Sequence, residues 1–317
     1  MALAFIFPGQ GSQTPGMGRD LAAAFPIARH TFQEVDDALE QKLSRIIFEG
    51  TPDELTLTAN AQPALMAVSM AVVRVLEVEG GFNLRERVAL VAGHSLGEYS
   101  ALTAAGALPV ATAARLLRLR GQAMQQAVPP EIGAMAALLG AEADLATEIC
   151  AEAAPGEHGR EVLELANDNG GGQSVISGHR TAVLRAIELA KTRGVKRGML
   201  LPVSAPFHSS LMAPAAETMA EALATAGMVE PMPALVANVT AARATDPAEI
   251  IDLLVRQVTG TVRWRECVAA MVAMGCDRFV EIGAGKVLTG LMKRNAPDAM
   301  AGAIGTPADI EAFLASV

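Results

Sequence analysis

The sequence predicts an α/β fold, in which a mostly parallel sheet carries helices on both of its faces. Residues 3–7, 87–92 and 279–282 are short apolar strands, and each runs into a glycine-containing turn followed by a helical pattern. Short strands that alternate with longer helices are typical of parallel sheets, because the connecting helices cover both faces. Residues 131–202 follow a different order of elements and predict an inserted subdomain.

Two long helical patterns belong to the main part of the chain, at residues 61–79 and 109–127. The first has apolar residues around most of its circumference, which predicts a helix buried in the core. The second has a polar face and an apolar face. We therefore expect it to lie with its apolar face toward the sheet.

The inserted subdomain is predicted from six elements in the order βαββαβ, which is typical of a ferredoxin-like fold. The elements are expected at residues 134–139, 142–154, 161–166, 173–177, 181–193 and 198–203. Prolines at both ends of this stretch mark its boundaries. The chain is thus divided into residues 1–130 and 203–317, which form the core, and residues 131–202, which form the insert. The contact between the two is expected to create a cleft.

The composition indicates a folded chain with no affinity for nucleic acid. Its 317 residues are enough for one large domain that carries a smaller one. Hydrophobic residues make up 51% and aromatic residues only 3%, so the core is built mainly from alanine, valine, leucine and methionine. The net charge of −9, with no basic run, argues against non-specific binding of nucleic acid.

The cysteines and the apolar stretches predict a cytoplasmic protein with no membrane partner. Cys150, Cys267 and Cys276 are odd in number and widely spaced, which indicates buried or free thiols in a reducing compartment. The apolar start MALAFIF has no basic region before it and meets Pro8 and Gly9 too soon for a signal peptide. No uncharged apolar stretch has the length of a membrane span.

The loop FPGQGSQTPGMG at residues 7–18 follows the first strand directly. Such a loop either cradles a phosphate or directs a backbone N–H at another developing negative charge. The dinucleotide pattern GxGxxG fails because Thr14 stands at the last glycine, and IGAGK at residues 282–286 fails as a phosphate loop because Val287 follows the lysine. No cluster has metal-ligand spacing. We therefore expect neither a bound cofactor nor a metal.

Gly93, Ser95 and Gly97 form a GxSxG pattern between a predicted strand and a predicted helix. This context is typical of a nucleophile elbow, a turn so tight that glycines must flank the serine. A serine hydroxyl needs a base to become a nucleophile. His208, in PVSAPFH near the point where the insert rejoins the core, is the preferred candidate because ligands collect at that edge of a parallel sheet.

The other histidines fit the role of base less well. His94 precedes Ser95 and should direct its ring away from the hydroxyl. His30 is predicted on a surface helix, His158 in a polar loop and His179 at a helix entry.

Arg120 falls on the apolar face of the helix predicted at residues 109–127. A buried arginine is costly unless it is paired. Two interpretations stay open: an internal salt bridge with a protein carboxylate, or a fork that accepts the carboxylate of a substrate in a bidentate manner.

Taken together, these motifs closely resemble the malonyl-CoA:acyl-carrier-protein transacylases of bacterial fatty-acid synthesis. The resemblance is carried by FPGQGSQ, GHSLGEYSAL, RLRGQAMQQAVP, PVSAPFH and GKVLTGLMKR, and it spans nearly the whole chain. It implies an α/β-hydrolase-like core with a ferredoxin-like insert. It also implies transfer of a malonyl group from malonyl-CoA to the phosphopantetheine thiol of acyl carrier protein, without a cofactor beyond the coenzyme A thioester itself.

The resemblance also implies roles for individual residues. Ser95 takes the acyl group by a ping-pong mechanism, and His208 acts as general base and then as general acid. The family has no triad aspartate, and a backbone carbonyl at Gln257 orients the histidine instead. The backbone N–H groups of Gln10 and Leu96 form the oxyanion hole.

Three further residues are expected to bind the substrate. Arg120 binds the free carboxylate of the malonyl group, while Phe207 and Met124 line the pocket. The ring of Phe207 is expected to crowd an α-substituent and so to favour malonyl over methylmalonyl. Two groups of basic residues are candidates for docking the acidic carrier protein: Lys191, Arg193, Lys196 and Arg197, or Lys286, Lys293 and Arg294.

Two other functions stay open at this stage. A serine esterase or thioesterase shares the elbow but needs a triad carboxylate, for which Asp168 or Asp246 is available. A carrier-protein docking module without catalytic activity is the second alternative.

Overall fold

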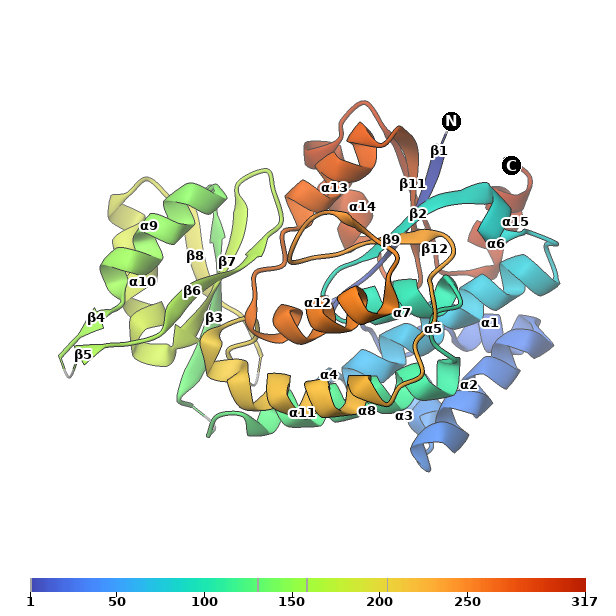
Figure 1. Cartoon of the computed structure of the whole chain (residues 1–317), viewed down its shortest axis with the longest axis horizontal. Coiled ribbons are helices and arrows are strands. Elements are labelled where there is room, and N and C mark those ends of the chain that lie inside the picture. Colours follow the sequence, from blue (N-terminus) through green and yellow to red (C-terminus); the bar gives the residue numbers. More distant parts are fainter. Residues whose placement is uncertain (1, 130, 158, 204) are drawn as a thin grey trace.

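The computed structural model describes residues 2–129, 131–157, 159–203 and 205–317, and it confirms a mixed α/β protein with a mostly parallel central sheet. The central sheet has six strands in the order β10-β9-β2-β1-β11-β12 (Figure 1). They are β1 (Ala2–Phe7), β2 (Val88–Gly93), β9 (Ala234–Val236), β10 (Arg243–Ala244), β11 (Cys276–Ile282) and β12 (Met300–Ile304). Neighbouring strands are parallel except at the edge, where β9 and β10 pair antiparallel.

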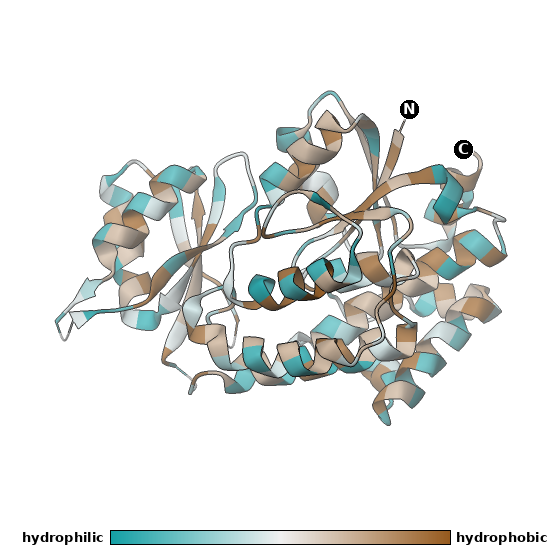
Figure 2. Cartoon of the chain, viewed as in Figure 1, coloured by the Kyte–Doolittle hydropathy of each residue, from teal (hydrophilic) through white to brown (hydrophobic). Residues whose placement is uncertain are grey.

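Strand β1 shows why both faces of this sheet must be covered. Its side chains alternate, so that Phe5 and Phe7 join one hydrophobic core while Ala4 and Ile6 join a second core on the opposite face. The first core is closed mainly by four helices, α2 (Pro26–Leu39), α5 (Thr58–Val78), α7 (Gly97–Ala104) and α8 (Val110–Gln126). The second is closed by α13 (Trp264–Ala273) and α14 (Val287–Asn295). In Figure 2 the outer helices of the molecule carry both hydrophilic and hydrophobic residues. This is expected of helices that pack one face against the core and leave the other face in solvent.

The helices connect these strands, and the long ones begin and end within a few residues of the predicted bounds. They are α1 (Arg19–Ala24), α2 (Pro26–Leu39), α3 (Leu43–Glu49), α4 (Pro52–Thr56), α5 (Thr58–Val78), α6 (Leu84–Arg87), α7 (Gly97–Ala104), α8 (Val110–Gln126), α9 (Ala143–Ala153), α10 (Arg180–Thr192), α11 (Ala213–Ala224), α12 (Pro247–Thr259), α13 (Trp264–Ala273), α14 (Val287–Asn295) and α15 (Pro307–Leu314).

Helix α5 is the core helix that its composition predicts. It is 21 residues long and apolar enough to cross a membrane by length and composition. However, 83% of its most apolar window is buried inside the protein, where it packs against α2 and α8. Its apolar surface is thus used by the core. The three cysteines are also buried and free, as predicted.

Residues between α8 and α11 form a second, antiparallel sheet with the order β6-β7-β3-β8. Its strands are β3 (Gly133–Leu139), β6 (Leu163–Asp168), β7 (Gln173–His179) and β8 (Arg197–Leu200), and α9 and α10 pack on it. A short hairpin extends from one end of this part of the molecule (Figure 1), and its two strands, β4 (Pro155–Gly156) and β5 (Gly159–Arg160), are each two residues long. All six predicted elements are present, in the predicted order.

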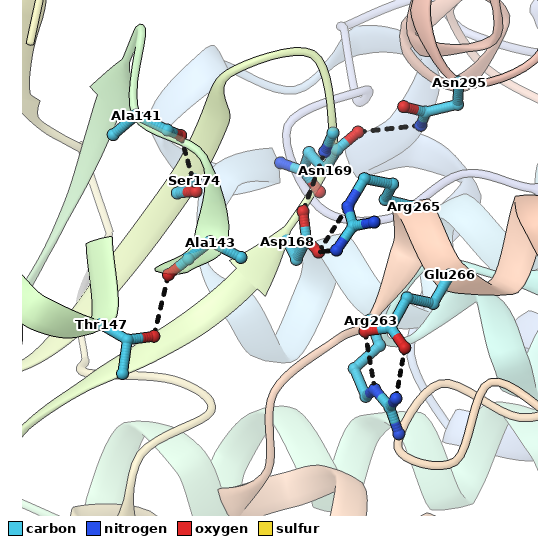
Figure 3. Close-up of polar contacts among 11 residues, drawn as sticks. Ala141, Ala143, Thr147, Asp168, Asn169, Ser174, Arg263, Arg265, Glu266 and Asn295 are labelled. Carbon is cyan, nitrogen blue, oxygen red and sulfur yellow. Dashed lines mark hydrogen bonds and ion pairs between the residues drawn. The ribbon is translucent and has the colours of Figure 1, made fainter. Parts of the chain in front are cut away.

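The turn between β6 and β7 fastens this second sheet to the core (Figure 3). Asp168 forms an ion pair with Arg265 at 2.8 Å, and the side chain of Asn295 donates to the carbonyl of Asn169 at 2.9 Å. The segment after α12 adds backbone contacts, because Val262 bridges to Asn167 in a parallel manner. The two sheets are therefore held together beside the carboxyl ends of the central strands.

Candidate active site

Ser95 lies at the sharp turn between β2 and α7, as the elbow motif predicts. Its φ of 54° is in the left-handed region, which non-glycine residues rarely adopt. A Cβ atom at Gly93 would lie 1.9 Å from the carbonyl carbon of Gly97, and one at Gly97 would lie 2.3 Å from the carbonyl oxygen of Phe7. Both positions therefore require glycine, and the turn presents the serine at the edge of the sheet.

Asn238, which sequence reasoning missed, holds the elbow from the neighbouring strand. It is fully buried just after β9; its Oδ1 accepts the N–H of Ser95 at 2.9 Å, and its Nδ2 donates to the carbonyl of Gly93 at 2.7 Å. The only sequence signal is a polar residue directly after a short apolar strand. Because the strained turn is held at two points, its conformation does not depend on the glycines alone.

His208 is the histidine that lies beside Ser95 in the structure. Its Nε2 lies 2.8 Å from Ser95 Oγ, and its Nδ1 lies 2.8 Å from the backbone carbonyl of Gln257. A carbonyl can only accept, so Nδ1 carries the proton and Nε2 is free to take one from the serine. His94 instead donates to Asn169 Oδ1 at 2.8 Å and is directed toward the second sheet.

The remaining histidines lie elsewhere. His30 is exposed on α2, and His179 is the N-cap of α10, where its Nδ1 accepts the N–H of Val162. His158 lies outside the described residues.

Neither of the two candidate triad carboxylates orients His208. Asp168 pairs with Arg265, and Asp246 caps α12 by accepting the N–H of Ala248. The histidine is therefore held by a neutral carbonyl. Burial, followed by the positive charge of Arg120, lowers the pKa of His208 to about 3. The imidazole is neutral at physiological pH and is able to accept a proton.

Arg120 is 1% exposed and has no carboxylate within 4.0 Å in the described part of the chain. Its guanidinium donates to three neutral oxygens, namely Gln62 Oε1 at 2.9 Å, Gln257 Oε1 at 2.9 Å and Ser95 Oγ at 3.2 Å. Of the two interpretations drawn from the helical pattern, the direct internal salt bridge is thus wrong. Gln62, which sequence reasoning missed, stands out in the sequence only as a polar residue inside the apolar α5.

A cavity of about 360 Å³ opens beside these groups, between the core and the second sheet. Phe207 and Met124 line it, as expected, together with Met135 and Leu201 from the second sheet and its end. The cavity is apolar on most of its wall and polar where Ser95, His208 and Arg120 converge, which is the usual composition of a small-molecule site.

Two backbone N–H groups are available at this cavity. Gln10 lies in the turn after β1, and Leu96 is the N-cap of α7; both line the cavity. Neither N–H donates to another group among the residues that the structure describes. The side chain of Gln10 is directed elsewhere, since its Nε2 donates to Thr58 Oγ1 at 3.4 Å. No group of three or more histidine, cysteine, aspartate or glutamate residues that could hold a metal occurs in the described ranges.

A serine on a strand–helix elbow, a histidine within hydrogen-bond distance and a substrate-sized cavity define a site for acyl transfer through a covalent ester. In agreement, residues 4–304 match the family model of the acyl transferase domain. The malonyl CoA-acyl carrier protein transacylase of Escherichia coli K12 is 44% identical over 98% of both chains. That of Bacillus subtilis strain 168 is 46% identical over 92% of this chain and 90% of its own.

Solved structures agree with these relatives. The acyl-carrier-protein S-malonyltransferase of Bartonella henselae is 56% identical, with a TM-score of 0.96 over 100% of this chain and 99% of that one. A malonyl-transacylase in complex with a type II PKS acyl-carrier protein is 40% identical, with a TM-score of 0.95 over 100% of both chains. The chain belongs to the malonyl CoA-acyl carrier protein transacylase family.

Proposed function

We propose that the protein transfers the malonyl group of malonyl-CoA to the phosphopantetheine thiol of acyl carrier protein for fatty-acid biosynthesis, through an ester on Ser95. The observation that carries this proposal is the pairing of a nucleophile with an anion-binding group. Arg120 lies within 3.2 Å of Ser95 Oγ, is buried, and has only neutral hydrogen-bond partners among the residues that the structure describes. An acyl group that brings its own carboxylate supplies the direct anionic partner that Arg120 lacks.

In the first half-reaction, malonyl-CoA enters the cavity with its carboxylate on Arg120, which exchanges its contact with Ser95 Oγ for a bidentate pair. Ser95 attacks the thioester carbonyl while His208 Nε2 takes the hydroxyl proton. The N–H groups of Gln10 and Leu96 stabilise the tetrahedral oxyanion, and each such donor contributes about 3 kcal/mol. Coenzyme A then leaves as the thiol with the proton from His208, and malonyl-Ser95 remains.

In the second half-reaction, His208 takes the proton of the phosphopantetheine thiol, whose sulfur attacks the malonyl-Ser95 ester. Collapse of the second tetrahedral intermediate returns a proton to Ser95 and releases the malonyl thioester. The backbone carbonyl of Gln257 keeps the proton on Nδ1 throughout, so that Nε2 alternates between acceptor and donor. The ring of Phe207, which lines the cavity beside Met124, crowds an α-substituent and so favours malonyl over methylmalonyl.

Acyl carrier protein docks where its prosthetic arm can reach the cavity, and the relative solved with its carrier protein supports this partner. Of the two basic groups, the one on the insert is partly neutralised, because Lys191 pairs with Glu188 and Arg193 with Glu148 and Glu152. Lys286, Lys293 and Arg294 form no ion pair with any residue in the described ranges. Both groups stay candidates for the docking surface.

The architecture supports a finer description. We infer an α/β-hydrolase-like core, residues 1–130 and 203–317, and a ferredoxin-like insert, residues 131–202. The order β6-β7-β3-β8, antiparallel throughout, is what a βαββαβ unit produces when its first strand lies between its third and fourth. We also infer a cytoplasmic enzyme, because its three thiols are unpaired, as in reducing compartments.

The partition of the acyl-enzyme between thiol and water separates this function from that of a serine hydrolase. With labelled malonyl-CoA and a pantetheine acceptor, we expect transfer to exceed hydrolysis by at least about tenfold. The thiol is the better nucleophile, and neither Asp168 nor Asp246 is placed to support attack by water through His208. The readout is labelled malonyl-pantetheine against free malonate. Release of mostly malonate would support the thioesterase alternative instead.

The lowered pKa of His208 predicts that the rate of acylation of Ser95 changes little as the pH is lowered below neutrality. The base is the neutral imidazole, and its pKa of about 3 lies below the ordinary value of 6.5. Loading of Ser95 from acetyl-CoA, which has no carboxylate to titrate, should therefore change little between pH 8 and pH 5. A histidine with an ordinary pKa would lose about thirtyfold by pH 5. Stopped-flow measurement of single-turnover loading decides between these outcomes.

A further inference from the structure

Glu98 is a buried carboxylate that the reaction above does not use. It lies in the first turn of α7, three residues after the nucleophile, and is 1% exposed. Its Oε2 accepts from Gln257 Nε2 at 2.6 Å and from the N–H of Asn238 at 3.2 Å, whereas Oε1 has no partner in the described part of the chain. An acid in this position is costly to bury, so it requires a positive charge nearby.

Arg120 is that charge, and a single amide separates the two groups. Gln257 Oε1 accepts from Arg120 Nη2 at 2.9 Å, while Gln257 Nε2 donates to Glu98. The amide thus has its negative end toward the guanidinium and its positive end toward the carboxylate. This arrangement links the two charges electrostatically without letting the carboxylate occupy the arginine fork. A direct salt bridge would have filled the fork that the substrate needs.

We propose that Glu98 is a positioning residue that acts through Gln257 as the indirect counter-ion of Arg120 and so tunes how tightly the site holds a malonyl carboxylate. The inference rests on the proposed function. With Glu98 ionised, the empty site has no net charge, and the incoming carboxylate is attracted by Arg120 but repelled by Glu98. Without that charge, the repulsion disappears and the carboxylate binds more tightly, whereas an uncharged acetyl group gains nothing.

Titration of Glu98 supplies a test in the unmodified enzyme. Burial raises its pKa to about 7, and the other titratable groups around it do not change charge near neutral pH. Burial lowers the pKa of His208 to about 3 and lowers the pKa of His94 below its usual value. Burial also raises the pKa of Tyr99 to about 12 and raises the pKa of the Cys267 thiol. Arg120 keeps its charge.

The experiment compares malonyl-CoA with acetyl-CoA as the acyl donor for Ser95, each measured as kcat/KM for loading. In the wild-type enzyme, the malonyl-to-acetyl ratio should rise several-fold from pH 8.5 to pH 6, as Glu98 takes up a proton. In Glu98→Gln, which keeps the shape but not the charge, the ratio at pH 8.5 should be roughly tenfold above wild type and independent of pH. The gain should appear as a lower KM for malonyl-CoA.

Two further variants separate charge from shape. Glu98→Asp keeps the charge but shortens the side chain, and its ratio at pH 8.5 should stay near the wild-type value. Glu281→Gln is the matched control, since Glu281 is fully buried in β11 but its carboxylate accepts from Leu288 and Thr289, away from the cavity. Its ratio should equal that of the wild type at every pH.

A ratio that is insensitive to pH in the wild type and unchanged in Glu98→Gln overturns the inference about Glu98 alone. The wild-type pH profile decides the matter even if the glutamine variant does not fold. Failure of the wild type to load malonyl on Ser95 overturns the proposed function itself, and the role of Glu98 with it.

Discussion

Replacing Ser95 by alanine is expected to reduce malonyl transfer to acyl carrier protein by roughly ten-thousandfold or more. In the proposed mechanism both half-reactions pass through one ester, so removal of the Ser95 hydroxyl removes the position where the acyl group resides. The oxyanion hole and the arginine fork would still bind malonyl-CoA but could not turn it over. Transfer of label from malonyl-CoA to carrier protein, followed over hours with concentrated enzyme, measures the loss.

The control for this variant is its stability. Alanine has the same Cβ atom as serine, so the left-handed φ of 54° is no more strained than in the wild type. The N–H of residue 95 can still donate to Asn238 Oδ1, and the N–H of Gly97 can still donate to the carbonyl of His94. The midpoint of thermal unfolding should therefore stay within a few degrees of wild type. A folded Ser95→Ala enzyme that retains substantial transfer would show that the acyl group does not pass through Ser95.

Replacing Arg120 by alanine is expected to lower kcat/KM for malonyl-CoA by about a thousandfold. The kcat/KM for acetyl-CoA should change by no more than about tenfold. In the proposed mechanism the guanidinium is a desolvated, bidentate partner for the malonyl carboxylate, so its loss would leave that carboxylate buried and unpaired. Acetyl-CoA has no such carboxylate, and in the proposed mechanism its loading depends on Ser95, His208 and the two backbone N–H groups but not on Arg120. Loading of Ser95 from each donor, measured separately, provides the comparison.

Arg118→Ala is the matched control on the same helix. Arg118 lies two residues earlier, is partly buried, and donates to Asn60 Oδ1 at 2.7 Å instead of lining the cavity. Its removal should leave the malonyl-to-acetyl ratio near the wild-type value. Equal losses of malonyl and acetyl loading in Arg120→Ala would mean that Arg120 stabilises the fold and does not recognise the carboxylate.

Local chemistry explains which parts of the site could be predicted. The elbow is visible in the sequence because its geometry requires glycine at two positions around Ser95. A requirement for a particular residue type can be recognised from the sequence alone. Arg120 is visible because a charge on an apolar helix face contradicts the helical pattern. Strands β1, β2 and β11, the long helices α5 and α8, and the six elements of the second sheet follow from the pattern of their apolar residues, and the structure alters mainly their ends. Strands β9, β10 and β12 of the central sheet were not predicted.

Long-range contacts explain what could not be predicted. His208 is separated from Ser95 by 113 residues, and only the structure establishes the 2.8 Å contact between them. Asn238 and Gln62 are each polar residues among apolar neighbours in the sequence. Their positions in the sequence do not indicate that Asn238 contacts Ser95 or that Gln62 contacts Arg120. Glu98 was missed for a different reason. An acidic residue in the first turn of a helix already has an ordinary explanation in the helix dipole, so it attracts no notice.

The central claim is that a malonyl group rests on Ser95 between the two half-reactions, and direct identification of that ester tests it. Wild-type enzyme mixed briefly with malonyl-CoA in the absence of carrier protein, quenched in acid and digested, should yield one modified peptide, with malonate on Ser95. Adding holo carrier protein before the quench should remove the modification and produce malonyl carrier protein in equal amount. An unmodified Ser95 peptide under conditions of full turnover, or an ester on a different residue, would contradict the account.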